Sequence, residues 1–101
     1  MAKYVFSYRV PSDYEPNGAE TFAEWQSWLG GMGSALVDFG QAVTDNAAVG
    51  EVASGTTRLA GYSVVVAADI DAALAIAKGS PALRAGGGVE VGPVMEAAGR
   101  E

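Results

Sequence analysis

The chain contains no cysteine and no histidine. Without cysteine it forms no disulfide and offers no thiol nucleophile, and without either residue it lacks the usual ligands of a zinc finger. The absence of histidine also removes the side chain that most often transfers protons near neutral pH. Acid–base catalysis would have to use a carboxylate, a lysine or a tyrosine, and the sequence singles out none of them. We predict no catalytic residue and no cofactor.

Basic residues and long apolar runs are scarce. Six Lys and Arg stand against twelve Asp and Glu, which gives a net charge of −6, and basic residues such as Lys3, Arg9, Lys78 and Arg84 are scattered along the chain. Such a chain is not expected to bind nucleic acid. No segment approaches the roughly 20 apolar residues of a membrane span, and the N-terminus lacks the apolar stretch of a signal peptide. We expect no membrane partner and a cytoplasmic location.

The length and apolar content predict one small domain. The 101 residues, 50% of them hydrophobic, fit a single domain over 1–101 whose end, from about 95 to 101, is a frayed tail. A domain of this size buries only about two thirds of the surface that its unfolded chain exposes. Its stability is therefore modest, and pairing with a second copy would add to it.

The first forty residues predict a strand and a long helix. Residues 3–10 alternate, with Tyr4 and Tyr8 on one face and Arg9 on the other, which indicates a strand; residues 11–18 form a loop. Thr21 and Glu24 have the spacing of a capping box, so a helix is expected to begin there. Its apolar stripe consists of Phe22, Trp25, Leu29, Met32, Leu36 and Phe39. Three glycines at positions 30, 31 and 33 predict a bend, and Gly40 is a plausible stop.

The second half predicts two or three strands and a shorter helix. Residues 42–44 and 49–52 are short strand candidates, and 59–67 form an almost continuous β-branched run that is typical of a central strand covered on both faces. Asp69 or Asp71 then caps a helix with a stripe of Ile70, Ala73, Leu74 and Ala77. That helix ends at Lys78, Gly79 and Pro81, and three glycines at 86–88 lead into a last strand over 89–94.

This order predicts an α+β fold of the ferredoxin-like βαββαβ type, with a four-stranded antiparallel sheet and two helices on one face. The other face would then be bare and rich in aromatic and β-branched side chains. Because such an apolar patch is unfavourable in water, we expect a homodimer through the sheet face. The predicted assembly is a dimeric α+β barrel.

Five segments together resemble the YCII-related family and span most of the chain. They are EWQSWL at 24–29, ALVDFG at 35–40, LAGYSVVVAADIDAA at 59–73, GSPAL at 79–83 and GGVEV at 87–91. The resemblance implies a ferredoxin-like subunit in a dimeric α+β barrel. Some YCII-related proteins are proposed enzymes with a His-Asp pair, and others carry an Asp-Gly-Pro-Phe motif and accompany sigma factors. This chain departs from both, since it has no histidine and residues 53–58 read ASGTTR.

The family resemblance also implies a pocket between the end of the first strand and the first helix. There this chain offers Tyr8, Arg9, Trp25 and Trp28 as candidate ligand-binding residues. Each has a structural alternative: Tyr8 and Trp25 suit the core, and Trp28 suits either a pocket wall or a covered rim. Arg9 suits either a ligand carboxylate or a solvated salt bridge.

The other motifs in the sequence give little information about function. Gly31 and Gly33 lack the preceding strand and third glycine of a dinucleotide fingerprint, and the KGS sequence at 78–80 has no phosphate-binding loop before it. Acidic pairs at 13 and 15 and at 69 and 71 are too few for a metal cage, so no metal is predicted. We therefore expect a homodimeric domain that binds a small molecule. The alternatives are a non-catalytic interaction or regulatory module, of the type associated with sigma factors, and a cofactor-free enzyme.

Overall fold

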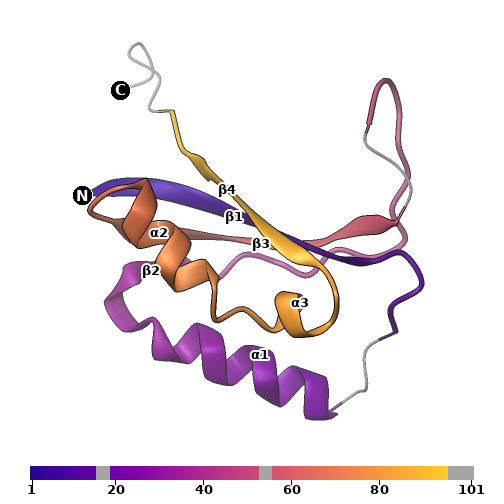
Figure 1. The fold of residues 1–101 in the computed structure, drawn as a ribbon, viewed down its shortest axis with the longest axis horizontal. Coiled ribbons are helices and arrows are strands. Elements are labelled where there is room, and N and C mark those ends of the chain that lie inside the picture. Colours follow the sequence, from indigo (N-terminus) through magenta and orange to yellow (C-terminus); the bar gives the residue numbers. More distant parts are fainter. Residues whose placement is uncertain (16–18, 53–55, 96–101) are drawn as a thin grey trace.

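The computed structural model describes residues 1–15, 19–52 and 56–95, which form an α+β fold with a four-stranded antiparallel sheet (Figure 1). The elements are β1 (Ala2–Pro11), α1 (Ala19–Gly31), the 3₁₀ turn η1 (Gly33–Ala35), β2 (Leu36–Asp38), β3 (Thr57–Ala67), α2 (Ile70–Ala77), α3 (Pro81–Arg84) and β4 (Gly88–Pro93). The strands lie in the order β2-β3-β1-β4. This arrangement is compatible with the predicted ferredoxin-like fold.

The central strand pair confirms the predicted alternation. β1 pairs antiparallel with both β3 and β4, and its Tyr4, Phe6 and Tyr8 are buried. The side chains between them, such as Val5 and Arg9, point to the opposite face and are only half-buried. One face of the sheet therefore carries the core, and the other does not.

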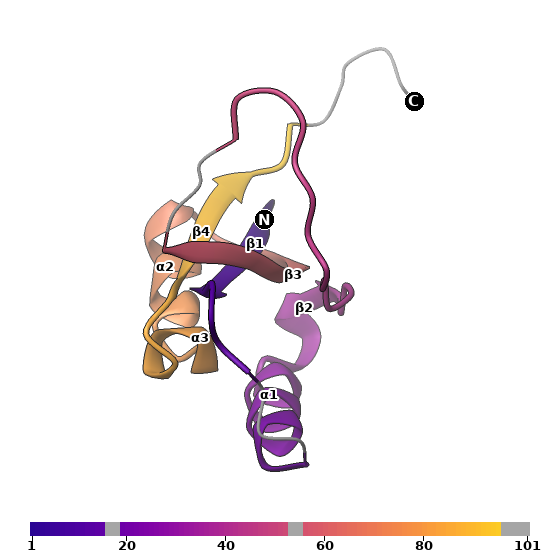
Figure 2. The same ribbon diagram turned by 90° about the vertical axis from the view of Figure 1, so that its right-hand side faces the viewer.

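All three helices lie on the buried face of the sheet, as the two views in Figures 1 and 2 show. The core that they cover consists of Tyr4, Phe6, Tyr8, Val65, Ala67, Ala73 and Ala77, with Trp25 and Trp28 of α1 packed against it. Two helices were expected on this face, and α3 is an addition. It begins at Pro81, where the buried Ser80 hydroxyl accepts a hydrogen bond of 3.1 Å from the Ala82 N–H.

The first helix differs from the prediction at both ends. It is already helical at Ala19, so Thr21 is not its N-cap. It ends at Gly31, and Gly33 has a φ of 58°, a left-handed conformation that ends the regular helix. Leu36, which was predicted to continue the helical stripe, instead lies in β2 and pairs with Val65 of β3. A long-range strand pairing has overridden a local helical spacing.

Between β2 and β3 the predicted short strands are replaced by extended chain. Ala42 makes a single antiparallel bridge with Gly61, and the described residues at 49–52 form no strand, with Val49 being 91% exposed. Gly40, predicted as a helix stop, has a φ of 80°. A Cβ there would overlap the Tyr62 carbonyl oxygen, so glycine lets this segment lie directly against β3.

The second half confirms more of the prediction. β3 is an inner strand, although its outer face is half-buried rather than covered, with Tyr62 37% exposed. Asp69 caps α2 by accepting a 2.9 Å hydrogen bond from the Ala72 N–H. The predicted stripe on α2 is half correct, since Ala73 is buried and Leu74 is 42% exposed. The last strand forms as β4, and the predicted frayed tail falls mostly outside the described residues.

Candidate functional site

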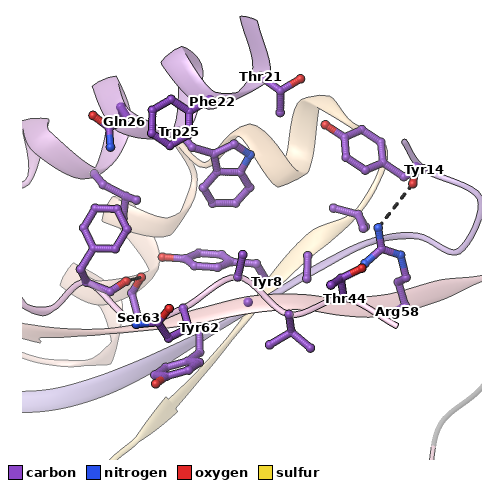
Figure 3. A pocket seen from close by; sticks show the side chains of 18 residues that line it. Tyr8, Tyr14, Thr21, Phe22, Trp25, Gln26, Thr44, Arg58, Tyr62 and Ser63 are labelled. Carbon is purple, nitrogen blue, oxygen red and sulfur yellow. Dashed lines mark hydrogen bonds between the residues drawn. The ribbon is translucent and has the colours of Figure 1, made fainter. Parts of the chain in front are cut away.

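A cavity of about 380 Å³ lies between α1 and the sheet, with one side open to solvent. Figure 3 shows it from close by. Its residues come from β1, the following loop, α1, the segment after β2, and β3. They are Tyr8, Val10, Tyr14, Thr21, Phe22, Trp25, Gln26, Leu29, Phe39, Gln41, Ala42, Val43, Thr44, Arg58, Ala60, Gly61, Tyr62 and Ser63.

The aromatic wall of the cavity follows from two periodicities. Alternation along β1 turns Tyr8 toward α1, and the helical spacing of Phe22, Trp25 and Leu29 turns one face of α1 toward the sheet. The rings of Tyr8 and Trp25 meet edge to face, with centroids 4.8 Å apart and planes at 71°. Phe22, 64% exposed, lies one helical turn before Trp25 on the open side. The cavity is thus walled mainly by rings.

A β-bulge in β3 helps to position the wall of the cavity that the segment 41–44 forms. Tyr8 pairs with Gly61 and Arg9 pairs with Leu59, which leaves Ala60 as an extra residue in β3. The free Ala60 carbonyl oxygen accepts a 2.8 Å hydrogen bond from the Val43 N–H. The segment 41–44 is therefore tied to β3 beside the cavity, although it is not itself a regular strand.

Tyr8 places an unpaired polar group in this apolar wall. Its residue is only 4% exposed, and its hydroxyl oxygen is buried and forms no hydrogen bond with any described residue. Burial raises the pKa of the Tyr8 phenol to about 12, and the nearby Ser63 hydroxyl offsets part of that rise. Near neutral pH the phenol therefore keeps its proton and acts as a hydrogen-bond donor rather than as a base.

Arg58 supplies the positive charge. It is the single charged residue among the described residues that line the cavity. Its Nη2 atom donates a long hydrogen bond of 3.4 Å to the Tyr14 carbonyl oxygen, which is drawn in Figure 3. Among the side chains that the structure describes, the ion pair that forms joins Arg84 to Glu24, and Arg58 pairs with none of the described carboxylates.

The structure brings two of the four predicted site residues together. Tyr8 and Trp25 line the cavity. Trp28 instead stacks on Phe6, with centroids 6.3 Å apart and planes at 17°, and lines a separate hollow with Met32 and Ile76.

The fourth predicted residue, Arg9, points to the opposite face of the sheet. There its Nε donates to the Thr57 hydroxyl oxygen at 3.0 Å, and its Nη2 donates to the Thr57 carbonyl oxygen at 3.1 Å. The cavity has Arg58 where the sequence analysis expected Arg9.

Sequence reasoning missed Arg58 because the predicted strand began at residue 59, whereas β3 begins at Thr57, and a bulge then decides on which face Arg58 lies. Strict alternation back from the cavity-facing Gly61 would put Arg58 on the outer face of the sheet. The extra residue Ala60 shifts the register by one, so that Arg58 pairs with Val10 on the cavity side. A bulge depends on the paired strand, and no local signal in the sequence marks it.

Neither a metal site nor a membrane-spanning helix is found in the described structure. No three carboxylates come together there in a way that would hold a cation, and Asp69 is engaged as a helix cap. No helix among these residues is long and apolar enough to cross a membrane.

No family model matches the chain, and no curated protein matches it either.

Proposed function

We propose that the chain is a YCII-related, homodimeric domain that binds a small molecule in the cavity between α1 and the sheet. The observation that carries this proposal is the cavity itself, whose lining combines aromatic and aliphatic side chains with Arg58, which forms no ion pair with the described carboxylates. Ligand sites are typically concave and largely apolar, with a few polar groups that orient the ligand. This cavity has that composition.

The polar groups favour binding over catalysis. A general base must lose its proton near the working pH, whereas Tyr8 has its pKa raised to about 12. The described lining contains no acidic residue and no lysine that would take the role of the base instead. Arg58 is therefore suited to hold a ligand by donating hydrogen bonds to it.

The open face of the sheet supports the homodimer. On this face lie Val5 of β1 and Tyr62, Val64 and Val66 of β3, which are opposite the helices and only partly buried in the single chain. A second copy that packs its own sheet there would bury these side chains and close a barrel between the two sheets. This is the assembly that the family resemblance implies.

The dimer is tested by light scattering at micromolar concentrations. We expect a mass of two chains, and we expect Val64→Glu to give a folded monomer because it places a charge in the centre of the interface. Ala75→Glu introduces the same charge at an exposed position of α2, on the other side of the sheet, and serves as the control that should remain dimeric. A wild-type protein that stays monomeric over this range would remove the dimer from the proposal.

Ligand binding is tested with a ligand-observed NMR screen of small aromatic compounds that include acids, amines and neutral molecules. Ala60 lines the cavity, whereas Ala75 is exposed on α2 away from it. We expect compounds that bind the wild type to bind Ala75→Leu equally well and Ala60→Leu at least about tenfold more weakly, because the larger side chain fills the site. The proposal fails when no compound of any class binds, or when Ala60→Leu binds as the wild type does.

An interaction module is the second candidate function, and one observation favours it. The described part of the segment after β2, up to residue 52, extends beyond the sheet on the side away from α1 (Figure 2). On this segment the Val49 residue is 91% exposed and the Val52 residue is 54% exposed. Exposed apolar side chains on a projecting segment suit contact with a protein partner. Replacing both valines with serine would weaken that contact while leaving the cavity intact.

A further inference from the structure

We infer that the ligand is a small aromatic carboxylate, whose carboxylate binds Arg58 and whose ring lies against Trp25 and Phe22. This inference rests on the proposed function and names the chemical class of its ligand. It combines two properties of the cavity that arise from different elements, namely the charge at one end and the rings at the other.

The charge selects an anion. Twelve acidic residues occur in the chain, yet none is among the described residues that line the cavity, whereas Arg58 is. A guanidinium has five N–H donors in a planar fork, and the described residues use one of them, in the long bond to the Tyr14 carbonyl oxygen. The remaining donors match the two oxygen atoms of a carboxylate, which arginine binds with two parallel hydrogen bonds.

The position of Arg58 supports a contact with a ligand rather than with solvent alone. Its side chain lies on the cavity side of the sheet because of the bulge at Ala60, and it is partly buried there. Figure 3 shows it below Tyr14, on the side of the cavity away from the hydroxyl of Tyr8. Partial burial strengthens a charge-assisted hydrogen bond relative to one in open water. An anion entering the cavity therefore meets its one counter-charge at this end.

The aromatic side chains of the cavity favour a ligand with a flat, apolar ring system. Trp25 lines the cavity and is only half-buried, and its ring meets Tyr8 edge to face, so part of the Trp25 ring remains available to a ligand ring. Phe22 adds a further exposed ring on the open side. A volume of about 380 Å³ is near the lower limit of ligand sites, which span roughly 300–1,000 Å³. One or two fused rings suit this space better than a nucleotide or a long acyl chain.

The test uses naphthoate and its neutral analogue naphthamide, which share a skeleton and differ in charge. Calorimetric titrations compare the wild type with Arg58→Gln, Arg58→Lys and the control Arg84→Gln, since Arg84 forms its ion pair with Glu24 on the surface. We expect naphthoate to bind the wild type at least tenfold more tightly than naphthamide. Arg58→Gln should weaken naphthoate about tenfold to a hundredfold and leave naphthamide and the thermal unfolding temperature nearly unchanged.

Arg58→Lys separates charge from geometry, since lysine keeps the charge but loses the planar fork. We expect it to recover only part of the affinity for naphthoate, and Arg84→Gln to bind as the wild type does. The inference is overturned if naphthamide binds as tightly as naphthoate, or if Arg58→Gln leaves naphthoate binding unchanged. In that case the proposed function would still hold if neutral or cationic compounds bind the wild type and bind Ala60→Leu more weakly. If no compound of any class binds, both fail.

Discussion

The Ser63 hydroxyl donates a 2.8 Å hydrogen bond to the Phe39 carbonyl oxygen. This bond ties the segment after β2 to β3, and it uses the proton that Ser63 could otherwise donate to the neighbouring Tyr8 oxygen. The phenol lies beside Ser63 (Figure 3), yet it makes no hydrogen bond with the described residues.

Removing the Tyr8 hydroxyl should therefore not destabilise the protein. A buried polar group without a partner costs about 1–3 kcal/mol, so we expect Tyr8→Phe to raise the free energy of unfolding by about 1 kcal/mol. Urea unfolding followed by circular dichroism measures this. Tyr4→Phe is the matched control on the same strand, because Tyr4 is also buried but its hydroxyl is not orphaned. A loss of stability in Tyr8→Phe would show that the hydroxyl does have a partner.

Stability should fall in strongly alkaline solution. The folded protein holds the pKa of Tyr8 at about 12, against 10.0 for an unburied tyrosine. The unfolded chain therefore releases this proton first, and folding loses stability as pH rises from 10 to 12. This difference between the folded and unfolded pKa corresponds to a loss of up to about 3 kcal/mol in the free energy of unfolding.

Urea unfolding at successive pH values tests this prediction, with Tyr8→Phe as the reference. The variant should lack that part of the loss which Tyr8 causes. Equal pH dependence in the two proteins would contradict the buried, protonated phenol.

Gly87 should be intolerant of any side chain. A Cβ at this position would overlap the Arg9 carbonyl oxygen at the start of β4. We expect Gly87→Ala to cost more than about 3 kcal/mol, because backbone rather than a mobile side chain must move. Gly30→Ala is the control, since nothing lies within 4 Å of its Cβ position in α1 and alanine favours a helix by about 1 kcal/mol. Thermal unfolding should thus show opposite shifts.

Asp69 should contribute to the stability of the protein only through its role as the N-cap of α2. Its carboxylate accepts the 2.9 Å hydrogen bond from the Ala72 N–H, and loss of such a cap costs about 1 kcal/mol. We expect that loss in Asp69→Ala and little change in Asp69→Ser, since serine is also a good N-cap. Chemical denaturation measures the stability of the two variants. Equal destabilisation of both would contradict a role of Asp69 that is limited to the cap.

Local signals predicted those parts of the fold whose structure is decided locally. The alternation around Phe6 marks β1, and the acid at position 69 marks the start of α2. Leu36 was misassigned because its spacing from Met32 is helical, whereas its pairing with Val65 depends on a strand almost thirty residues later. Strand pairing is a long-range interaction, so a local pattern cannot reveal which of two compatible structures forms.

The same distinction applies to the candidate site. The family resemblance grouped Tyr8 and Trp25 beside one pocket, and the structure brings their rings together because each faces the core from its own element. Alternation also put Arg9 opposite Tyr8, and the structure has it there. Arg58 could not be predicted, since the bulge that turns it toward the cavity exists only in the pairing of β1 with β3.

The two tryptophans provide the most direct test of the central claim, that the cavity between α1 and the sheet is a ligand site. Trp25 lines the cavity, whereas Trp28 stacks on Phe6 outside it. Two-dimensional NMR of the indole N–H groups, assigned with Trp25→Phe and Trp28→Phe, follows both during titration with naphthoate. We predict a saturable shift of the Trp25 signal that is clearly larger than that of Trp28. A shift confined to Trp28, or no shift of either signal at saturating naphthoate, would contradict the account.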